Sequence, residues 1–174
     1  MANYFSIGKL ASSHGLQGEL LVKHSLGKRS ALKGVTAIFL EERKNSFIPY
    51  FLQQVTVKDA EHVYIRLEGI ESKEAAQRLL PAQVYLTEED FKEQTASSAP
   101  LALLGYTVED EHHGVLGVVE EVIEMPMQVL VKVQIKGKEA LLPINEQSLV
   151  KMDKKKQVVH LNLPEGLVEL YTEG

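Results

Sequence analysis

The chain has 174 residues, a formal net charge of −5 at pH 7 and no cysteine, and 44% of its residues are hydrophobic. This length fits one large domain or two small ones, and the lack of cysteine excludes disulfides, thiolate catalysis and cysteine-ligated metals. The start of the chain has no signal-peptide pattern, and no window approaches the roughly 18–20 apolar residues that span a membrane. We therefore expect a soluble, cytoplasmic protein without a membrane partner.

The negative charge is concentrated in the second half of the chain. Residues 1–93 carry 12 Lys and Arg against 12 Asp and Glu, whereas residues 94–174 carry 7 against 12. A protein that holds RNA mainly through phosphates normally has a large basic excess, and five Phe and six Tyr without Trp do not indicate a stacking platform. The acidic second half suits a basic protein partner, although a contribution to solubility explains it equally well.

The first part of the chain has the pattern of a small closed β-barrel. Short β-branched or aromatic runs alternate with turns, and the expected strands are residues 4–7, 19–24, 37–40, 47–57 and 63–67. A helical period follows at residues 72–80, with Ser72 as N-cap and Pro81 as the stop. A strand at 83–86 and a second short helix at 88–93 complete a first domain of residues 1–93.

A tight turn is predicted between the first two strands, at His14-Gly15-Leu16-Gln17-Gly18-Glu19. Two glycines three residues apart favour a reversal because glycine reaches positive φ without steric cost. The turn carries two polar side chains, His14 and Glu19. Taken alone, the stretch favours a turn decorated with polar groups over a site of chemistry.

A linker is predicted at residues 94–100, which are small or polar and lack periodicity. The second domain, residues 101–174, again has the pattern of a small barrel, with strands expected at 104–108, 114–119, 129–135, 139–144 and 157–161. Met125 and Met127 either fill its core or form a pliant contact surface. Lys154-Lys155-Lys156 is either a solvated turn or a phosphate contact.

No motif of an enzyme or of a cofactor site is recognisable in the sequence. Asp110-Glu111-His112-His113 is the only dense cluster of metal-ligand types, but adjacent side chains on a turn diverge and no second cluster completes a site. A solvated turn is therefore favoured there. Phosphate-binding loops, the dinucleotide fingerprint and the nucleophile elbow are all missing, so we expect no catalysis and no cofactor.

The chain nevertheless resembles the family of the ribosome maturation factor RimM over almost its whole length. Its first half is similar to the family's opening signature at Ile7-Gly8-Lys9-Leu10 and His14 to Glu19, with Val22 in register. Its second half is similar to the family's PRC-barrel domain at Leu104-Gly105, Gly114, Leu116-Gly117, Gly137-Lys138-Glu139, Pro143-Ile144, Asp153 and Leu163-Pro164-Glu165-Gly166-Leu167. The chain departs from the family at Pro81, at residues 101–103 and at residues 125–128.

The resemblance implies a monomeric, chaperone-like assembly factor that is not an enzyme. It implies maturation of the 30S subunit head, support for 16S rRNA processing, and binding of the nineteenth small-subunit ribosomal protein. The ribosome-facing residues would be His14, Gly15, Leu16, Gly18, Glu19, Lys23, Lys28 and Arg29. The residues binding the ribosomal protein would be Leu104, Gly105, Tyr106, Met125, Pro126, Met127 and Pro143. The alternative function is a direct RNA-binding module of the translation-factor barrel type.

Overall fold

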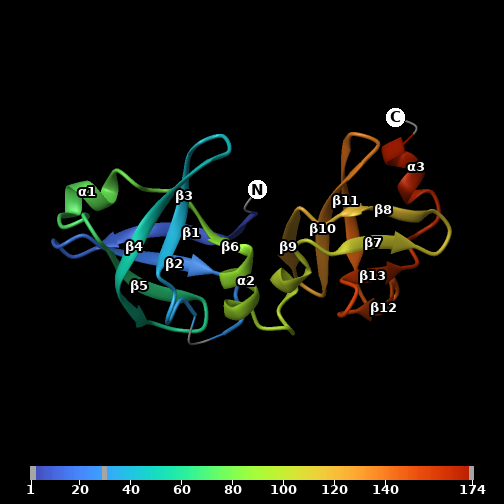
Figure 1. The fold of residues 1–174 in the computed structure, drawn as a ribbon. Helices are drawn as coiled ribbons and strands as arrows, with labels where there is room; N and C mark the ends of the chain where they lie inside the picture. The colour runs from blue at the N-terminus through green and yellow to red at the C-terminus, as the bar shows by residue number, and fades with distance from the viewer. Residues whose placement is uncertain (1–2, 29–30, 173–174) are drawn as a thin grey trace. The chain divides into compact units, whose positions relative to one another are not determined.

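The structure is a computed structural model that describes residues 3–28 and 31–172. The chain divides into two compact units, Met1–Ala102 and Leu103–Gly174, each built around β-strands (Figure 1). Residues 95–99 of the predicted linker belong to the first unit, where the Ala96 N–H donates a 2.8 Å hydrogen bond to the Leu26 carbonyl. No helix in the described residues is long and apolar enough to cross a membrane.

The first unit contains the predicted closed barrel. Its strands are all paired antiparallel in the order β1-β2-β5-β4-β3-β6. Alternation along each strand directs every second side chain inward, so that Val63, Ile65 and Leu67 are each 0% exposed. The strands are β1 (Tyr4–His14), β2 (Glu19–His24), β3 (Ala37–Arg43), β4 (Ser46–Val57), β5 (His62–Leu67) and β6 (Gln83–Thr87).

Two short helices flank these strands, α1 (Lys73–Gln77) and α2 (Glu88–Gln94). Each begins at a side-chain cap, because Ser72 Oγ accepts from the Ala75 N–H and Thr87 Oγ1 accepts from the Asp90 N–H. The first helix ends earlier than the predicted residue 80. Leu80 precedes Pro81, and the proline ring disfavours α-helical backbone at the residue before it.

The second unit consists of two sheets, so the mainly β prediction is confirmed. Beyond a 3₁₀ turn (Pro100–Leu103), one sheet has the order β11-β10-β9 and the other β12-β13-β7-β8, with β13 and β7 parallel. A 2.8 Å hydrogen bond from the Glu120 N–H, just before β9, to the Lys132 carbonyl on β10 extends the pairing of these two strands. The strands are β7 (Thr107–Asp110), β8 (Gly114–Val118), β9 (Glu121–Met125), β10 (Gln128–Ile135), β11 (Lys138–Ile144), β12 (Leu149–Asp153) and β13 (Val158–Leu161).

Sequence reasoning missed three elements of this unit, the strands β9 and β12 and the helix α3. The strand β9 lies at a sheet edge and contains two glutamates among its five residues, so it lacks a clear apolar run. The helix α3 (Leu167–Thr172) has six residues, too few to form a stable helix without tertiary contacts. The core of the unit combines both sheets, with Val131, Val133 and Leu142 buried in one and Val108 and Leu161 buried in the other.

Candidate functional site

The glycine-rich stretch forms the predicted tight turn between β1 and β2. His14 and Glu19 are paired residues of the two strands, and residues 15–18 make the reversal. Gly15 and Gly18 have φ angles of 70° and 91°, which is the left-handed region that favours glycine. The strand pairing therefore brings the two polar side chains of the motif together at one end of the barrel.

The tip of this hairpin is fixed against the turn that leads into α1. A Cβ atom at Gly18 would lie 2.4 Å from the Ile70 carbonyl oxygen, so only glycine allows this approach. The Lys73 N–H also donates a 3.1 Å hydrogen bond to the Leu16 carbonyl. The Leu16 side chain itself is 77% exposed, so it lies on the surface of the tip.

Glu19 lies between two basic side chains, and one of them was missed by sequence reasoning. Its carboxylate oxygens are 3.8 Å from His14 Nε2 and 3.8 Å from Arg66 Nε. Arg66 Nη2 donates a 2.9 Å hydrogen bond to Gln17 Oε1 of the turn. The His14 ring packs on Tyr64, with ring centroids 4.7 Å apart. Arg66 and Tyr64 are on β5, and strand pairing alone places them beside the motif.

The predicted basic residues do not gather at the hairpin tip. Lys23 is exposed on β2, opposite Lys9 on β1 and His62 on β5, so the three basic side chains form a row across neighbouring strands. Lys28 Nζ donates a 2.6 Å hydrogen bond to the Glu93 carbonyl, away from this row. Arg29 lies outside the described residues.

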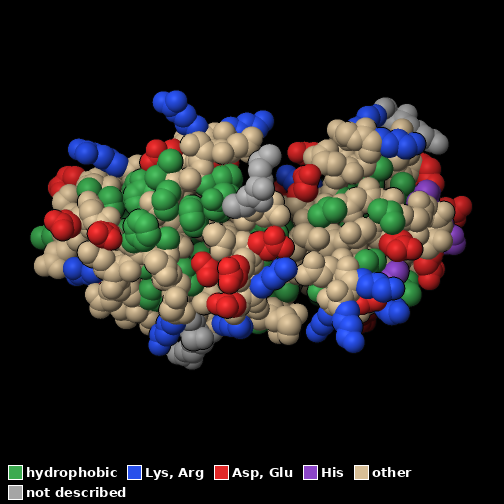
Figure 2. Space-filling view, in the orientation of Figure 1, with side chains coloured by type: hydrophobic (Ala, Val, Ile, Leu, Met, Phe, Trp, Pro, Cys, Tyr) green, Lys and Arg blue, Asp and Glu red, His purple; other side chains and the backbone are tan. Residues whose placement is uncertain are grey.

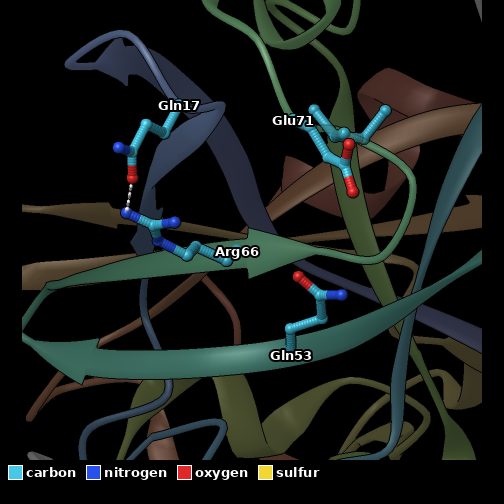
Figure 3. Close-up of a pocket in the computed structure, with 5 residues that line it drawn as sticks. Gln17, Gln53, Arg66 and Glu71 are labelled. Carbon is cyan, nitrogen blue, oxygen red and sulfur yellow. Dashed lines mark hydrogen bonds between the residues drawn. The ribbon is translucent and has the colours of Figure 1, made fainter.

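A polar recess of about 280 Å³ opens beside the hairpin. Its lining comes from the hairpin turn, β4, β5 and the turn before α1. Figure 3 shows the Gln53 and Glu71 side chains pointing toward each other across a space next to Arg66, whose guanidinium extends away from them toward Gln17. The lining residues are Gln17, Gln53, Arg66, Ile70 and Glu71. This site carries hydrogen-bonding groups of both kinds, donors and acceptors, but no nucleophile paired with a base.

Aromatic side chains cluster on the outer face of the first barrel. The ring centroid of Tyr4 lies 4.7 Å from that of Phe39 and 4.6 Å from that of Phe47. The ring centroids of Phe47 and Tyr85 are 4.8 Å apart. All four are partly exposed, and Figure 2 shows hydrophobic side chains gathered on the surface of this unit. Sequence reasoning missed this cluster because the barrel order sets β6 between β1 and β3.

The predicted contact residues of the second unit have very different exposures. Leu104 is 9% exposed and belongs to the core, and Gly105 and Tyr106 lie on the turn before β7. Met125, Pro126 and Met127 form the reversal between β9 and β10, in which Met127 is 100% exposed. Pro143 is partly exposed on β11. Of this group, the methionine reversal offers the most accessible apolar surface.

Residues 111–113 form an exposed turn after β7, as predicted, but the first residue of the cluster, Asp110, is buried and anchors the turn. Asp110 is 2% exposed and accepts hydrogen bonds from the N–H groups of Leu163 (3.0 Å), His112 (3.1 Å) and His113 (3.1 Å). Its Oδ2 also lies 2.8 Å from His113 Nδ1, while His113 Nε2 lies 2.8 Å from Glu169 Oε1. The network thus ties β7 to α3.

Charge and burial act in opposite directions on this network. Burial alone would raise the pKa of Asp110, but the hydrogen bonds from Leu163, His113 and His112 outweigh it and lower that pKa. The two carboxylates, Asp110 first and Glu169 second, raise the pKa of His113. Within the described residues, no three His, Asp or Glu side chains are arranged to hold a metal ion.

Comparison with known proteins identifies the family of the chain. Residues 5–91 match the RimM N-terminal domain, and residues 101–167 match the RimM PRC barrel domain. Proteins named ribosome maturation factor RimM from Flavobacterium psychrophilum and Parabacteroides distasonis are 28% and 31% identical to it. The first alignment covers 96% of both chains, and the second covers 95% of this chain and 96% of the relative.

A solved structure of a RimM protein from Pseudomonas aeruginosa is 20% identical, with a TM-score of 0.45 over 93% of this chain and 98% of that chain. The assignment itself depends on the domain matches and on the full-length relatives. Because both units match and the sequence relatives extend from end to end, this chain belongs to the RimM family.

Proposed function

We propose that this chain is a non-catalytic ribosome assembly factor that supports maturation of the 30S subunit head and processing of 16S rRNA. The observation that carries the proposal is that relatives named ribosome maturation factor match 95–96% of the chain, including both of its units. Two small β units can hold partners in position without any covalent step. The absence of a nucleophile paired with a base around the recess is compatible with such a role.

In this proposal, the second unit binds the nineteenth small-subunit ribosomal protein, and the chain acts as a monomer. The reversal between β9 and β10 supports this role, because the fully exposed Met127 and its neighbours Met125 and Pro126 offer an adaptable apolar contact. Residues 94–174 carry 12 acidic against 7 basic residues, a charge that favours encounter with a basic protein.

The first unit faces the immature subunit. The row formed by Lys9, Lys23 and His62 supports this orientation, because the two lysines on adjacent strands are cationic and suit the phosphate backbone of RNA. The same row favours the second candidate function, direct binding of naked RNA. The two functions differ in whether a protein partner is needed for tight association.

Calorimetric titration with the purified nineteenth small-subunit ribosomal protein, at two salt concentrations, tests the protein-binding role. We expect one-to-one binding that Met127→Glu weakens by roughly tenfold or more, as for a central interface residue. Val150→Glu, at an exposed position of β12 (52% exposed), is the matched control and leaves the affinity unchanged. If only a naked 16S head fragment binds, with affinity that falls steeply with salt, direct RNA binding is the function instead.

Co-sedimentation with immature 30S subunits tests the role of the first unit. Lys23→Glu reverses the central charge of the basic row and lowers the bound fraction, whereas Lys44→Glu, in the exposed turn between β3 and β4, does not. Equal binding by the Lys23 variant and the unaltered chain would count against the assignment of this surface.

A further inference from the structure

The recess beside the hairpin has the size of a site for one planar ring. At about 280 Å³ it lies just below the range of ~300–1,000 Å³ typical of small-molecule sites. Its walls come from four places in the first unit: Gln17 from the hairpin turn, Gln53 from β4, Arg66 from β5, and Ile70 and Glu71 from the turn before α1. A single base fits this space better than an extended ligand.

Arg66 is held in place on one side only. Its Nη2 donates to Gln17 Oε1 at 2.9 Å, and Glu19 Oε2 lies 3.8 Å from its Nε. The Nε atom is buried and makes no hydrogen bond within the described part of the chain. Gln17 and Glu19 therefore orient the guanidinium, and because Nε is buried, the donors that a ligand can reach are the Nη groups.

The opposite side of the recess carries free acceptors. Glu71 and Gln53 are exposed, and neither makes a hydrogen bond or ion pair in residues 3–28 and 31–172. Figure 3 shows both side chains turned toward the space beside Arg66. A carboxylate and a carboxamide thus line one end of the recess, and the Arg66 guanidinium lies at the other end, beside Gln17.

This combination selects against charged ligands. A phosphate would meet Arg66 but also the carboxylate of Glu71, with Glu19 already 3.8 Å from the guanidinium. An ammonium or guanidinium group would meet Arg66 itself. A neutral ring with donors on one edge and acceptors on another is the ligand that satisfies both walls.

We infer that this recess binds the base of an unpaired guanosine in RNA. Guanine presents two adjacent donors, N1–H and the N2 amino group, which suit the Glu71 carboxylate, and two acceptors, O6 and N7, which suit a guanidinium. Unpaired bases are commonly read in this way, through their edges and against Arg planes. The inference rests on the proposed function in one respect, since that function makes ribosomal RNA the source of the base.

Fluorescence anisotropy with short single-stranded RNA tests the inference on the full chain. The probes are a pyrimidine oligonucleotide with one central guanosine and matched oligonucleotides with inosine, adenosine or uridine at that position. We expect the guanosine probe to bind roughly tenfold more tightly than the inosine probe, because inosine lacks the N2 amino group that would pair with Glu71. Amide resonances of Gln17, Gln53 and Glu71 should shift on titration.

Surface variants identify the residues responsible. Glu71→Gln should remove most of the difference in affinity between the guanosine and inosine probes. Gln53→Ala should lower the affinity for the guanosine probe alone. Glu68→Gln, an equivalent charge change at an exposed residue outside the recess, should leave both affinities unchanged. Equal affinity for all four probes, resonance shifts confined to other surfaces, or occupation of the recess by an arginine-containing peptide in preference to RNA would overturn the inference.

Failure of the recess site and failure of the proposed assembly role give different experimental results. If the chain co-sediments with immature subunits but shows no preference for guanosine, the recess inference fails and the assembly role stands. If the chain binds the guanosine probe at the recess but not the subunits, the assembly role fails and the site stands.

Discussion

Gly18 is the residue at which backbone conformation and tertiary packing are most tightly coupled. Its φ of 91° disfavours any residue with a side chain, and an added Cβ would lie 2.4 Å from the Ile70 carbonyl oxygen. The strain alone costs about 1–3 kcal/mol, and displacement of the Ile70 turn adds to it. We therefore expect Gly18→Ala to lower the free energy of unfolding by at least that amount, as measured by denaturant titration.

Gly15→Ala is the matched control for this prediction. Gly15 has a similar φ of 70°, but nothing lies within 4 Å of the position of its Cβ, so the cost is limited to the conformational strain. Similar losses in the two variants would show that the contact with Ile70 contributes nothing to stability.

His24 is a second residue whose environment leads to a measurable prediction. It is 2% exposed, and its Nδ1 accepts a 3.1 Å hydrogen bond from the Leu26 N–H. Burial lowers its pKa and His62 lowers it further, while Glu61 and Asp59 partly offset this. Protonation at Nδ1 would also remove the bond to Leu26, so the folded state favours the neutral ring.

The sign of the resulting pH dependence follows from this preference. Because the folded pKa of His24 lies below its ordinary value of 6.5, the contribution of His24 to stability is fully present above pH 6.5 and is lost as pH falls through the folded pKa. His24→Asn keeps an acceptor for Leu26 but does not titrate. Unfolding free energies between pH 5 and 8 should fall less steeply on acidification for this variant than for the unaltered chain, and parallel curves would contradict the assignment.

At the scale of elements, the helix α3 depends on a tie that sequence periodicity does not reveal. His113 connects Asp110 at the end of β7 to Glu169 on α3, and Tyr171 Oη donates a 3.4 Å hydrogen bond to the Leu141 carbonyl. The pKa of His113 is raised, so the protonated ring is the form that the folded state favours. While the two carboxylates are ionised, the tie is fully present below pH 6.5 and weakens as pH rises through the folded pKa of His113.

Hydrogen exchange of the α3 amides measures this tie. Glu169→Gln should speed exchange at Leu170 and Tyr171 several-fold near neutral pH, whereas Glu165→Gln, an exposed residue before the helix, should not. In the unaltered chain, protection should decrease as pH rises above 6.5, after correction for intrinsic rates. Unchanged protection in the Glu169 variant would mean that packing alone holds α3.

Elements with strong local signals were predictable from the sequence, and those that depend on tertiary contacts were not. The strand at 63–67 shows a clean alternation that the buried Val63, Ile65 and Leu67 confirm. The site is different, because Arg66 reaches the hairpin only through the pairing of β2 with β5. Nothing in the residues near Arg66 in the sequence indicates that contact.

At the scale of the whole molecule, the division into two units leads to the last prediction. Each unit has a buried apolar core of its own, which includes Leu20, Ile38 and Leu86 in the first unit and Val131, Leu142 and Leu161 in the second. The segment before the boundary is held by the first unit, through the hydrogen bond between Ala96 and Leu26. We therefore expect residues 1–102 and 103–174, produced separately, each to fold.

The position of the cut provides the control for this experiment. A first fragment that ends at residue 93 loses the Ala96 contact and the packing of Ala96 and Ala99 near Gly27, so it should unfold at a lower temperature than the fragment 1–102. Circular dichroism and amide spectra that match the corresponding signals of the full chain would establish independent folding. If fragment 103–174 stays unfolded while 1–102 folds, the second core is too small to be stable alone, as is common for the smallest domains, and the two units must be treated as one cooperative structure.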